Sequence, residues 1–417
     1  MLSSKLLILG TYYTECEIVK RAKALGYYTI VTDSHENDLL RPAKALSNEC
    51  WNISWTDIDA LEKKCREVGV NGVVAGFSER RVEGMIELCN RLGLPCSITM
   101  DQLNVTRDKL KFKVVCRNNG ISCVPEYNYG EDIKLPVIVK PVDRAGSIGI
   151  NVAYTIEKYE KDYQYAMSMS DSKQVIIEEY ISDGIKFDVY YYVQDGDIVF
   201  LGSSDTIMCK GSEGAEILQK AWPFPSKHEY EYLKKEDQHV RMMIRNLGID
   251  NCYLTMSAFY RNGCFYFFEA GFRLSGEMSF NYYKSISGGD YLDVFIRYAM
   301  GEKENMKLKE TKNSNSYFIV LNFFGKDGEV DRIEGVEEIQ RIESVCHFLC
   351  YVQKGEQIRN KTRIFKKIAM CSICCNSKSE LVSVVEYVNR AFSVKDKVGN
   401  EMIYEKLSND ELLSSIN

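Results

Sequence analysis

Residues 135–150 read LPVIVKPVDRAGSIGI, an apolar strand that ends in Lys140 directly before a loop containing Gly146, Ser147 and Gly149. Lysine supplies a point charge, and small residues let successive backbone N–H groups approach phosphate oxygens. The stretch is not a Walker loop, because the lysine precedes the glycines and no GK[ST] sequence opens a helix. It predicts a phosphate site, with a lysine at a strand edge beside a hairpin turn as the plainer alternative.

A second apolar strand, in QVIIEEYISDG (174–184), ends in Glu178 and Glu179, and Tyr180 and Ile181 follow in a bend. Adenine needs one hydrogen-bond donor and one acceptor in the plane of its ring. Backbone groups around residues 179 to 181 can supply both, flanked by apolar packing. The alternative is an acidic strand end in water.

A third strand, in GCFYFFEAGFRLSGE (263–277), is aromatic and ends in Glu269, and Arg273 follows four positions later. Mg²⁺ favours oxygen ligands, and the planar fork of arginine can hold a phosphate or carboxylate through two bonds. The pattern therefore indicates a metal and phosphate site. A Glu–Arg ion pair at a sheet edge is the simpler interpretation.

The sequence around these stretches predicts a mixed architecture. Residues 5–95 alternate β-branched runs with helical periodicity, which predicts a parallel sheet of the α/β class. Further along, Asp195-Gly196 and Asn262-Gly263 predict antiparallel hairpins, so the middle region is α+β. A polar, lysine-rich stretch precedes two more apolar runs that flank an Asp327-Gly328 turn, and a smaller third domain follows.

The composition narrows the class of partner. The chain has 417 residues and a net charge of -6, which argues against a polyanion held by bulk electrostatics. No apolar stretch approaches membrane-spanning length, and the 15 scattered cysteines suggest free thiols in a reducing compartment, so we expect a cytoplasmic protein. Cys371, Cys374 and Cys375 invite a zinc interpretation, but the alternating apolar residues around them favour a buried strand.

The order of the three motifs resembles that of the ATP-grasp superfamily, in particular the group of biotin carboxylase, phosphoribosylglycinamide synthetase and the carbamoyl-phosphate synthase large subunit. The resemblance covers nearly the whole chain. It implies an ATP-grasp fold with a Rossmann-like pre-grasp domain at 1–100, a two-lobed grasp domain at 101–305 whose lid lobe covers about 115–187, and a biotin-carboxylase-like C-terminal domain at 306–417.

The resemblance also assigns roles to residues. TRDKLKFKVVCRNNGISCVPEY (106–127) resembles the helix that carries a first ATP lysine, Lys109, and VIVKP resembles the lid strand that bears the second, Lys140. Glu269 would bind Mg²⁺, or Mn²⁺ in its place, and Arg273 and Lys140 would be catalytic. The residues implied at ATP are Lys109, Lys140, Gly146, Ser147, Gly149, Glu178, Glu179, Tyr180, Ile181 and Asp188. The residues implied on the substrate side are Ser78, Glu79, Arg273 and Ser275.

Three positions depart from the family pattern. Ser257 stands where members carry a second metal carboxylate, twelve positions before Glu269, and Gly271 stands where they carry an asparagine. Lys186 stands where members carry the acid that binds the ribose, and the nearby Asp188 is the candidate to replace that acid. Water and phosphate oxygens would then complete the magnesium shell.

The resemblance implies an ATP-dependent carboxylate–amine or bicarbonate–amine ligase that works through an acyl phosphate, phosphoribosylglycinamide-synthetase-like or amino-acid-ligase-like. A nucleotide-binding protein without ligase activity is the rival. An NAD-dependent oxidoreductase is a third hypothesis, because Gly10 closes the first strand and Asp33 ends the second, as in a dinucleotide-binding layout. Gly10 is, however, one glycine where the dinucleotide fingerprint has three. We expect small carboxylate and amine substrates, no nucleic acid and no membrane, with a homodimer as the candidate assembly.

Overall fold

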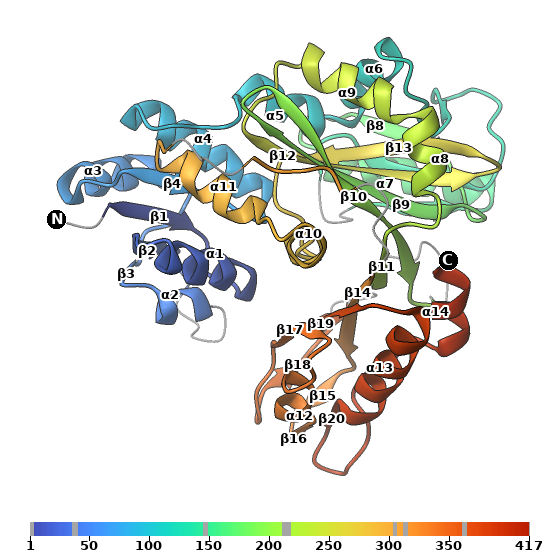
Figure 1. Ribbon diagram of the computed structural model, residues 1–417. Helices are drawn as coiled ribbons and strands as arrows, with labels where there is room; N and C mark the ends of the chain where they lie inside the picture. The colour runs from blue at the N-terminus through green and yellow to red at the C-terminus, as the bar shows by residue number, and fades with distance from the viewer. Residues whose placement is uncertain are drawn as a thin grey trace.

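The β-branched runs near the start of the chain form a parallel four-stranded sheet in the computed structural model, in the order β3-β2-β1-β4 (Figure 1). The prediction of a parallel sheet is therefore confirmed. The structure describes residues 4–35, 41–144, 149–210, 218–302, 307–311, 316–360 and 365–416. The first elements are β1 (Lys5–Leu9), α1 (Tyr13–Ala24), β2 (Tyr28–Thr32), α2 (Pro42–Leu46), β3 (Glu49–Trp51), α3 (Ile58–Val68), β4 (Gly72–Val74) and α4 (Glu79–Leu92).

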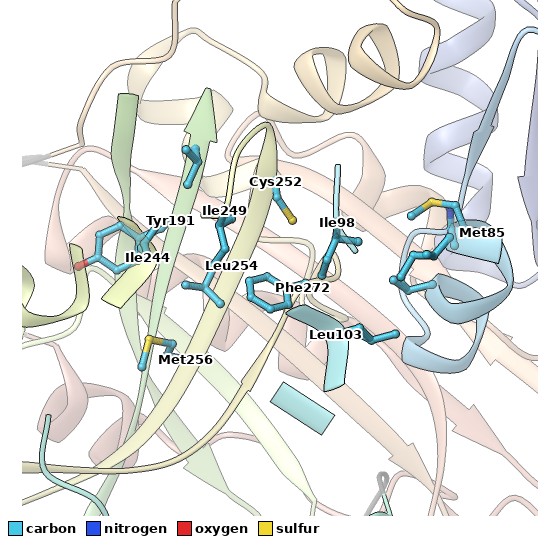
Figure 2. Packing of buried hydrophobic residues seen from close by; sticks show 14 of the residues in the cluster. Met85, Ile98, Leu103, Tyr191, Ile244, Ile249, Cys252, Leu254, Met256 and Phe272 are labelled. Carbon is cyan, nitrogen blue, oxygen red and sulfur yellow. The ribbon is translucent and has the colours of Figure 1, made fainter. Parts of the chain in front are cut away.

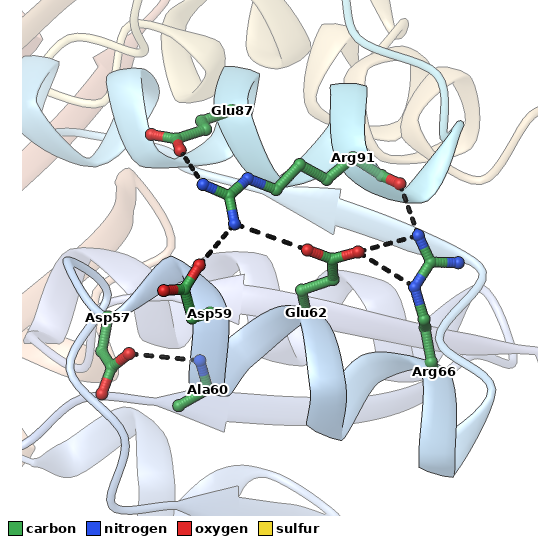
Figure 3. A network of polar contacts seen from close by, with 7 residues as sticks. All are labelled: Asp57, Asp59, Ala60, Glu62, Arg66, Glu87 and Arg91. Carbon is green, nitrogen blue, oxygen red and sulfur yellow. Dashed lines mark hydrogen bonds and ion pairs between the residues drawn. The ribbon is translucent and has the colours of Figure 1, made fainter.

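Helices α3 and α4 are joined by a surface network of charges (Figure 3). The guanidinium of Arg91 on α4 donates to Glu87 and to Asp59, each at 2.6 Å. Arg66 on α3 donates to Glu62 at 2.9 Å and to the backbone carbonyl of Arg91 at 2.6 Å. Exposed ion pairs contribute little energy singly, so the network mainly fixes how the two helices lie against each other.

The next region forms a small antiparallel sheet in the order β5-β8-β6-β7, which carries the strand that ends at Lys140. Helix α7 packs on one face of this sheet through a satellite core of apolar residues. The elements are α5 (Met100–Arg107), α6 (Lys109–Asn118), β5 (Glu126–Tyr127), β6 (Val137–Pro141), β7 (Asn151–Ala153), α7 (Ile156–Met169) and β8 (Val175–Glu179).

Two hairpins form one end of a large antiparallel sheet. The β9/β10 hairpin turns at Asp195 and Gly196 and the β12/β13 hairpin at Asn262 and Gly263, and all four residues have positive φ, as a two-residue type I′ turn requires. Both predicted hairpins are confirmed. The elements here are β9 (Ile185–Gln194), β10 (Asp197–Met208), β11 (Gln219–Phe224), α8 (Glu229–Lys235), α9 (Asp237–Asn246), β12 (Cys252–Arg261), β13 (Cys264–Gly271), α10 (Phe280–Ser287) and α11 (Tyr291–Ala299).

The large sheet continues into the last part of the chain, in the order β13-β12-β9-β10-β11-β14-β19-β17. Because its strands come from both sides of residue 305, the domain boundary placed there stays a prediction. The last elements are β14 (Tyr317–Gly325), β15 (Gly328–Glu329), β16 (Arg332–Glu334), α12 (Val336–Gln340), β17 (Val345–Cys350), β18 (Gln357–Ile358), β19 (Lys366–Cys375), α13 (Lys378–Ala391), β20 (Ser393–Lys395) and α14 (Asn409–Ser415).

The run after the Asp327-Gly328 turn does not fold back on β14 as a hairpin. Strand β15 pairs with β18 instead, and the N–H of Val330 donates to the carbonyl of Glu356 at 2.9 Å. The three clustered cysteines lie on β19, between β14 and β17. Their pairing with both neighbouring strands confirms the strand interpretation. Among the described residues no group of three or more His, Cys, Asp and Glu side chains could hold a metal ion.

A continuous apolar core joins the parallel sheet to the large sheet (Figure 2). Met85 of α4 and Leu103 of α5 belong to the same cluster as Leu254 of β12 and Phe272, just beyond β13. Close-packed side chains of this kind transmit position from one element to the next. The loops at the edge of the parallel sheet are therefore held in place relative to β13, which carries Glu269.

Candidate functional site

A buried carboxylate between two lysines lies at the centre of the site. Glu178 at the end of β8 contacts Lys140 of β6 through Oε2 and Lys113 of α6 through Oε1, each at 2.5 Å. All three side chains are buried, and Lys113 also donates to the carbonyl of Val124 at 2.7 Å. Burial alone would raise the pKa of Glu178, but the two lysines lower it below its ordinary value. Oε2 of Glu126 also lies 3.4 Å from Nζ of Lys113, so Lys113 has two acidic partners, whereas Glu178 is the ion-pair partner of Lys140.

Lys109 adds a further positive charge beside this cluster. Its Nζ donates to the carbonyl of Arg144 at 2.7 Å and to that of Val142 at 3.3 Å, in the segment that leaves β6. Burial lowers the pKa of Lys109, and the charge of Lys140 lowers it further. Two cations held this close gain from an anion placed between them. Lys109 and Lys140, predicted separately as phosphate ligands, are thus brought together.

The glycine loop after Lys140 is described only at its ends. Gly146 and Ser147 lie outside the described residues. Gly149 has a φ of +77°, and a Cβ on it would lie 2.7 Å from Cγ of Pro141. Only glycine fits this position, because it tolerates the left-handed conformation and the close approach to β6.

A cavity of about 460 Å³ lies beside the bend that follows β8. Tyr180 and Ile181 line it, as predicted for a base pocket, whereas the carboxylate of Glu179 binds Arg261 at 2.6 Å. A planar base favours such a pocket with apolar walls. The apolar lining consists of Ile138, Tyr180, Ile181, Ile207, Met208 and Phe259. The polar part of the wall includes Lys186, Asp205, Thr206 and Lys227.

The expected ribose acid, Asp188, is engaged elsewhere. It is buried, and its two oxygens accept hydrogen bonds from Ser257 at 2.5 Å and from Thr206 at 2.9 Å. Lys186, two residues earlier on β9, lines the cavity instead. Asp205 is an acid that does line the cavity, and burial raises its pKa to about 6.

Glu269 is the carboxylate best placed to meet a metal ion. It is exposed near the end of β13 and lies directly opposite Ser257 of β12, which in turn lies opposite Asp188 of β9. The charge of Glu269 also acts on Lys109. A carboxylate that faces solvent beside lysines predicted to bind phosphate suits Mg²⁺, which retains several waters and takes its other ligands from phosphate oxygens. The residues present therefore fit the ion through Glu269, with no second protein carboxylate from Ser257.

The predicted substrate loop is tied to the segment that carries Arg273. The N–H of Leu274 donates to the carbonyl of Gly76 at 2.9 Å, two residues before Ser78, the N-cap residue of α4, and close to Glu79, the first residue of that helix. The charge of Glu79 acts on Lys109, and Arg273 Nη1 donates to the Leu274 carbonyl at 3.3 Å. The predicted substrate loop, the segment that carries Arg273, and Lys109 are thus brought into one region.

Ser275, another predicted substrate residue, faces the protein interior. It is buried, and its hydroxyl accepts from the hydroxyl of Tyr253 at 3.0 Å and contacts Ser279 at 2.9 Å. Its contacts fix the backbone that follows Arg273. Ser275 therefore supports this backbone from the interior of the protein.

Sequence reasoning missed three charged residues of this region. Lys113 reads as an ordinary helix lysine, and its role depends on Glu178, far along the chain. Glu277 closes the GFRLSGE motif; it is buried, and burial and Asp188 raise its pKa. Lys367 of β19 lies within the electrostatic range of Glu277, and burial lowers its pKa to about 8. No local motif marks Lys113 or Lys367.

The edge of the parallel sheet does not offer a dinucleotide cradle at Gly10. A Cβ on Gly10 would lie 2.3 Å from Nη1 of Arg81, so the guanidinium occupies the space above the turn. Arg81 is buried and pairs with Glu15 of α1 at 2.7 Å. The pyrophosphate of a dinucleotide needs open backbone at this glycine. The structure therefore argues against the NAD hypothesis.

Comparisons with known proteins cover the region of these motifs. Residues 108–307 match the family model described as the carbamoyl-phosphate synthase L chain, ATP binding domain. Among relatives, the formate-dependent phosphoribosylglycinamide formyltransferase of Nostoc sp. is 29% identical over 193 residues, 43% of this chain and 48% of that protein. The Francisella tularensis subsp. tularensis protein of the same name is 26% identical over 255 residues, 52% of this chain and 63% of that protein. The chain spans about half the length of the first of these relatives.

Solved structures match over almost the whole chain. The L-amino acid ligase of Bacillus licheniformis has a TM-score of 0.78 at 16% identity, covering 95% of this chain and 99% of that one. The phosphoribosylglycinamide synthetase of Anaerococcus prevotii has a TM-score of 0.73 at 17% identity, covering 95% and 100%. The biotin carboxylase of Campylobacter jejuni has a TM-score of 0.77 at 16% identity, covering 99% and 94%. At such identities the likeness establishes the fold.

Proposed function

We propose that this ATP-grasp protein is an ATP-dependent ligase that activates a carboxylate as an acyl phosphate and joins it to an amine, releasing ADP and phosphate. The observation that carries the proposal is the meeting of Lys109, Lys140 and the exposed carboxylate of Glu269 in one site. Positive charge and an oxygen ligand at one place are what the transfer of a phosphoryl group requires.

The nucleotide would extend from the cavity to the lysines. Its base would lie against Tyr180 and Ile181, whose cavity has apolar walls. Its phosphates would meet Lys140, which Glu178 holds at the end of β6, and Lys109. Both lysines are fixed by short contacts, so little reorganisation is needed when the phosphates arrive.

Mg²⁺ would be held by Glu269, and Mn²⁺ can replace it because both ions prefer oxygen ligands. When bound, the ion would neutralise charge on the phosphate oxygens. The side chains of the protein have the other roles. Lys109 and Lys140 orient the phosphates, and Arg273 neutralises the charge on the oxygens of the acyl phosphate.

The chemistry would proceed in two steps. A carboxylate oxygen attacks the γ-phosphorus and ADP leaves; the amine then attacks the acyl carbon, phosphate leaves, and the amine loses a proton. Glu277 lies four residues after Arg273 and has a raised pKa, which suits it to accept that proton.

Formate is the first carboxylate to test, because the matched relatives are named formate-dependent phosphoribosylglycinamide formyltransferases. Phosphoribosylamine with glycine, two amino acids, and bicarbonate are the other candidates, given the ligases of similar fold. A substrate with a carboxylate or phosphate group would find Lys367 as its counter-charge near Glu277.

The direct test is the release of ADP in the presence of pooled carboxylates and amines. ADP formed with one pair of pools and absent when either pool is omitted supports a ligase. ATP binding that is indifferent to Mg²⁺, with no ADP formed in any pool, contradicts the proposal and favours the nucleotide-binding protein without ligase activity. This rival hypothesis is motivated by Ser257, Gly271 and Lys186, the three positions that depart from the family pattern.

The proposed partners are small molecules. In the described part of the chain no helix is long and apolar enough to cross a membrane. A homodimer and a place in the cytoplasm remain part of the proposal, and sedimentation of the purified chain tests the first of them.

A further inference from the structure

The last helix of the chain closes one side of the nucleotide cavity. Glu411, Ser414 and Ser415 of α14 line the same cavity as Tyr180 and Ile181. Figure 1 shows α14 beside β11, at the point where the large sheet passes from the central region to the last part of the chain. Residues separated by more than half of the sequence thus share one pocket.

A buried lysine fastens this helix and the segment before it. Lys220 of β11 is only 1% exposed and forms ion pairs with Glu405 and with Glu411, the latter at 2.8 Å. Burial would lower the pKa of Lys220, but the hydrogen bonds that it donates to the two carboxylates raise the pKa above its ordinary value. A buried cation is costly unless it is paired, so the two glutamates are required at this place.

A second contact fastens the far end of α14 at the cavity wall. Nζ of Lys227 donates to the carbonyl of Ser414 at 3.0 Å. Lys227 itself lines the cavity, and its N–H donates to Asp205, another lining residue, at 3.3 Å. The helix is therefore attached to the wall that would contact a bound nucleoside.

We propose that α14 forms the outer wall of the nucleotide cavity and that its ion pair with Lys220 sets how long the nucleotide stays bound. This inference rests on the proposed function, because it takes the cavity as the site of the nucleoside of ATP. A nucleoside enclosed between the bend at Tyr180 and α14 leaves more slowly than one in an open groove. Loss of the Lys220–Glu411 pair lets the helix move away and shortens the dwell time.

Adjacent acids on α14 provide a matched pair of variants. Glu411→Gln removes the charge that Lys220 binds, whereas Asp410→Asn removes an exposed charge one residue away. A fluorescent N-methylanthraniloyl derivative of ADP is bound and then displaced by excess ADP. We expect release to be ~10-fold faster from Glu411→Gln, the effect of losing one charge-assisted hydrogen bond, and unchanged from Asp410→Asn.

A second pair of variants tests the wall without touching the ion pair. Ser414→Phe places a ring into the cavity, and Leu413→Phe places one on the exposed side of the same helix. We expect Ser414→Phe to weaken binding of the fluorescent nucleotide ~10-fold or more and Leu413→Phe to leave it unchanged. Circular dichroism on heating checks that each variant is folded.

The possible outcomes distinguish a failure of this inference from a failure of the proposed function. If the wild-type protein binds the nucleotide and all four variants bind and release it alike, α14 is not a wall of the site and the inference is wrong, while the proposed function stands. If the wild-type protein binds no adenine nucleotide, the proposed function is contradicted and the inference with it.

Discussion

Nζ of Lys140 lies 2.5 Å from Oε2 of Glu178, and the other oxygen of the same carboxylate lies 2.5 Å from Nζ of the buried Lys113. Glu178 thus holds two cations together that would otherwise repel each other. One of them, Lys140, stands at the strand end where the phosphates would arrive. We therefore propose that Glu178 positions a lysine and that the residues after it line the pocket for the base.

Removing the charge of Glu178 should destabilise the fold. Glu178→Gln leaves the buried Lys140 without its counter-charge and Lys113 with Glu126 alone, and we expect the free energy of unfolding to fall by about 3 kcal/mol. Urea unfolding measures the change. The matched control is Glu179→Gln, whose partner Arg261 is near the surface, and we expect a change below about 1 kcal/mol. Equal losses in the two variants would mean that the buried triad is not a stabilising unit.

Lys140 should be essential for rapid turnover. We expect Lys140→Ala to lower ATP turnover with the true substrates ~100-fold or more, because it removes a positive charge at the phosphates. Lys134→Ala, at an exposed lysine just before the same strand, should leave turnover unchanged. Steady-state ADP release measures both. Wild-type turnover in Lys140→Ala would show that another residue is the lid lysine.

Glu269 should govern the need for Mg²⁺. In Glu269→Gln we expect the Mg²⁺ concentration that gives half-maximal nucleotide binding to rise ~10-fold or more, since the neutral amide is a poorer ligand. Ser257→Ala, directly opposite on β12, is the control and should shift it little, because Ser257 contacts Asp188. Calorimetric titration of ADP at a series of Mg²⁺ concentrations measures the shift. A larger shift in Ser257→Ala than in Glu269→Gln would place the ion at Asp188.

The pH dependence of the KM of the anionic substrate should show whether Lys367 acts at the substrate site. Its pKa is lowered to about 8 by burial, so the side chain is charged below pH 8 and loses its charge as the pH rises through that value. We expect the KM of the anionic substrate to rise above pH 8, and Lys367→Arg to move that rise to higher pH because arginine stays charged. The KM of ATP should not show this rise above pH 8. A profile that is the same in both proteins would remove Lys367 from the substrate site.

The fold could be predicted, and a candidate site proposed, because their signals are local. The phosphate lysine, the aromatic strand that ends in Glu269 and the turns at Asp195-Gly196 and Asn262-Gly263 are each visible within a few residues, and their order indicates the ATP-grasp fold. The fold matches those of known ATP-grasp ligases, so this prediction is confirmed. Strand ends can be recognised in sequence because side-chain patterns and turn residues change there.

The remaining features depend on contacts between distant segments. The helical pattern around Lys113 suggests a solvent-facing lysine, yet its partner Glu178 is brought to it by the small sheet of β5 to β8. Asp188 was expected at the ribose but is held by Ser257 on the next strand, a pairing that only the strand register fixes. The contribution of α14 to the cavity likewise depends on Lys220, almost two hundred residues earlier in the chain.

The most direct test of carboxylate activation is to follow an oxygen atom. The enzyme is incubated with MgATP, the amine pool and formate or another carboxylate labelled with oxygen-18, and inorganic phosphate is analysed by mass spectrometry. An acyl phosphate leaves one carboxylate oxygen on the phosphate, so we predict one oxygen-18 atom per phosphate released. Phosphate without the label, formed together with the ligated product, would contradict the account.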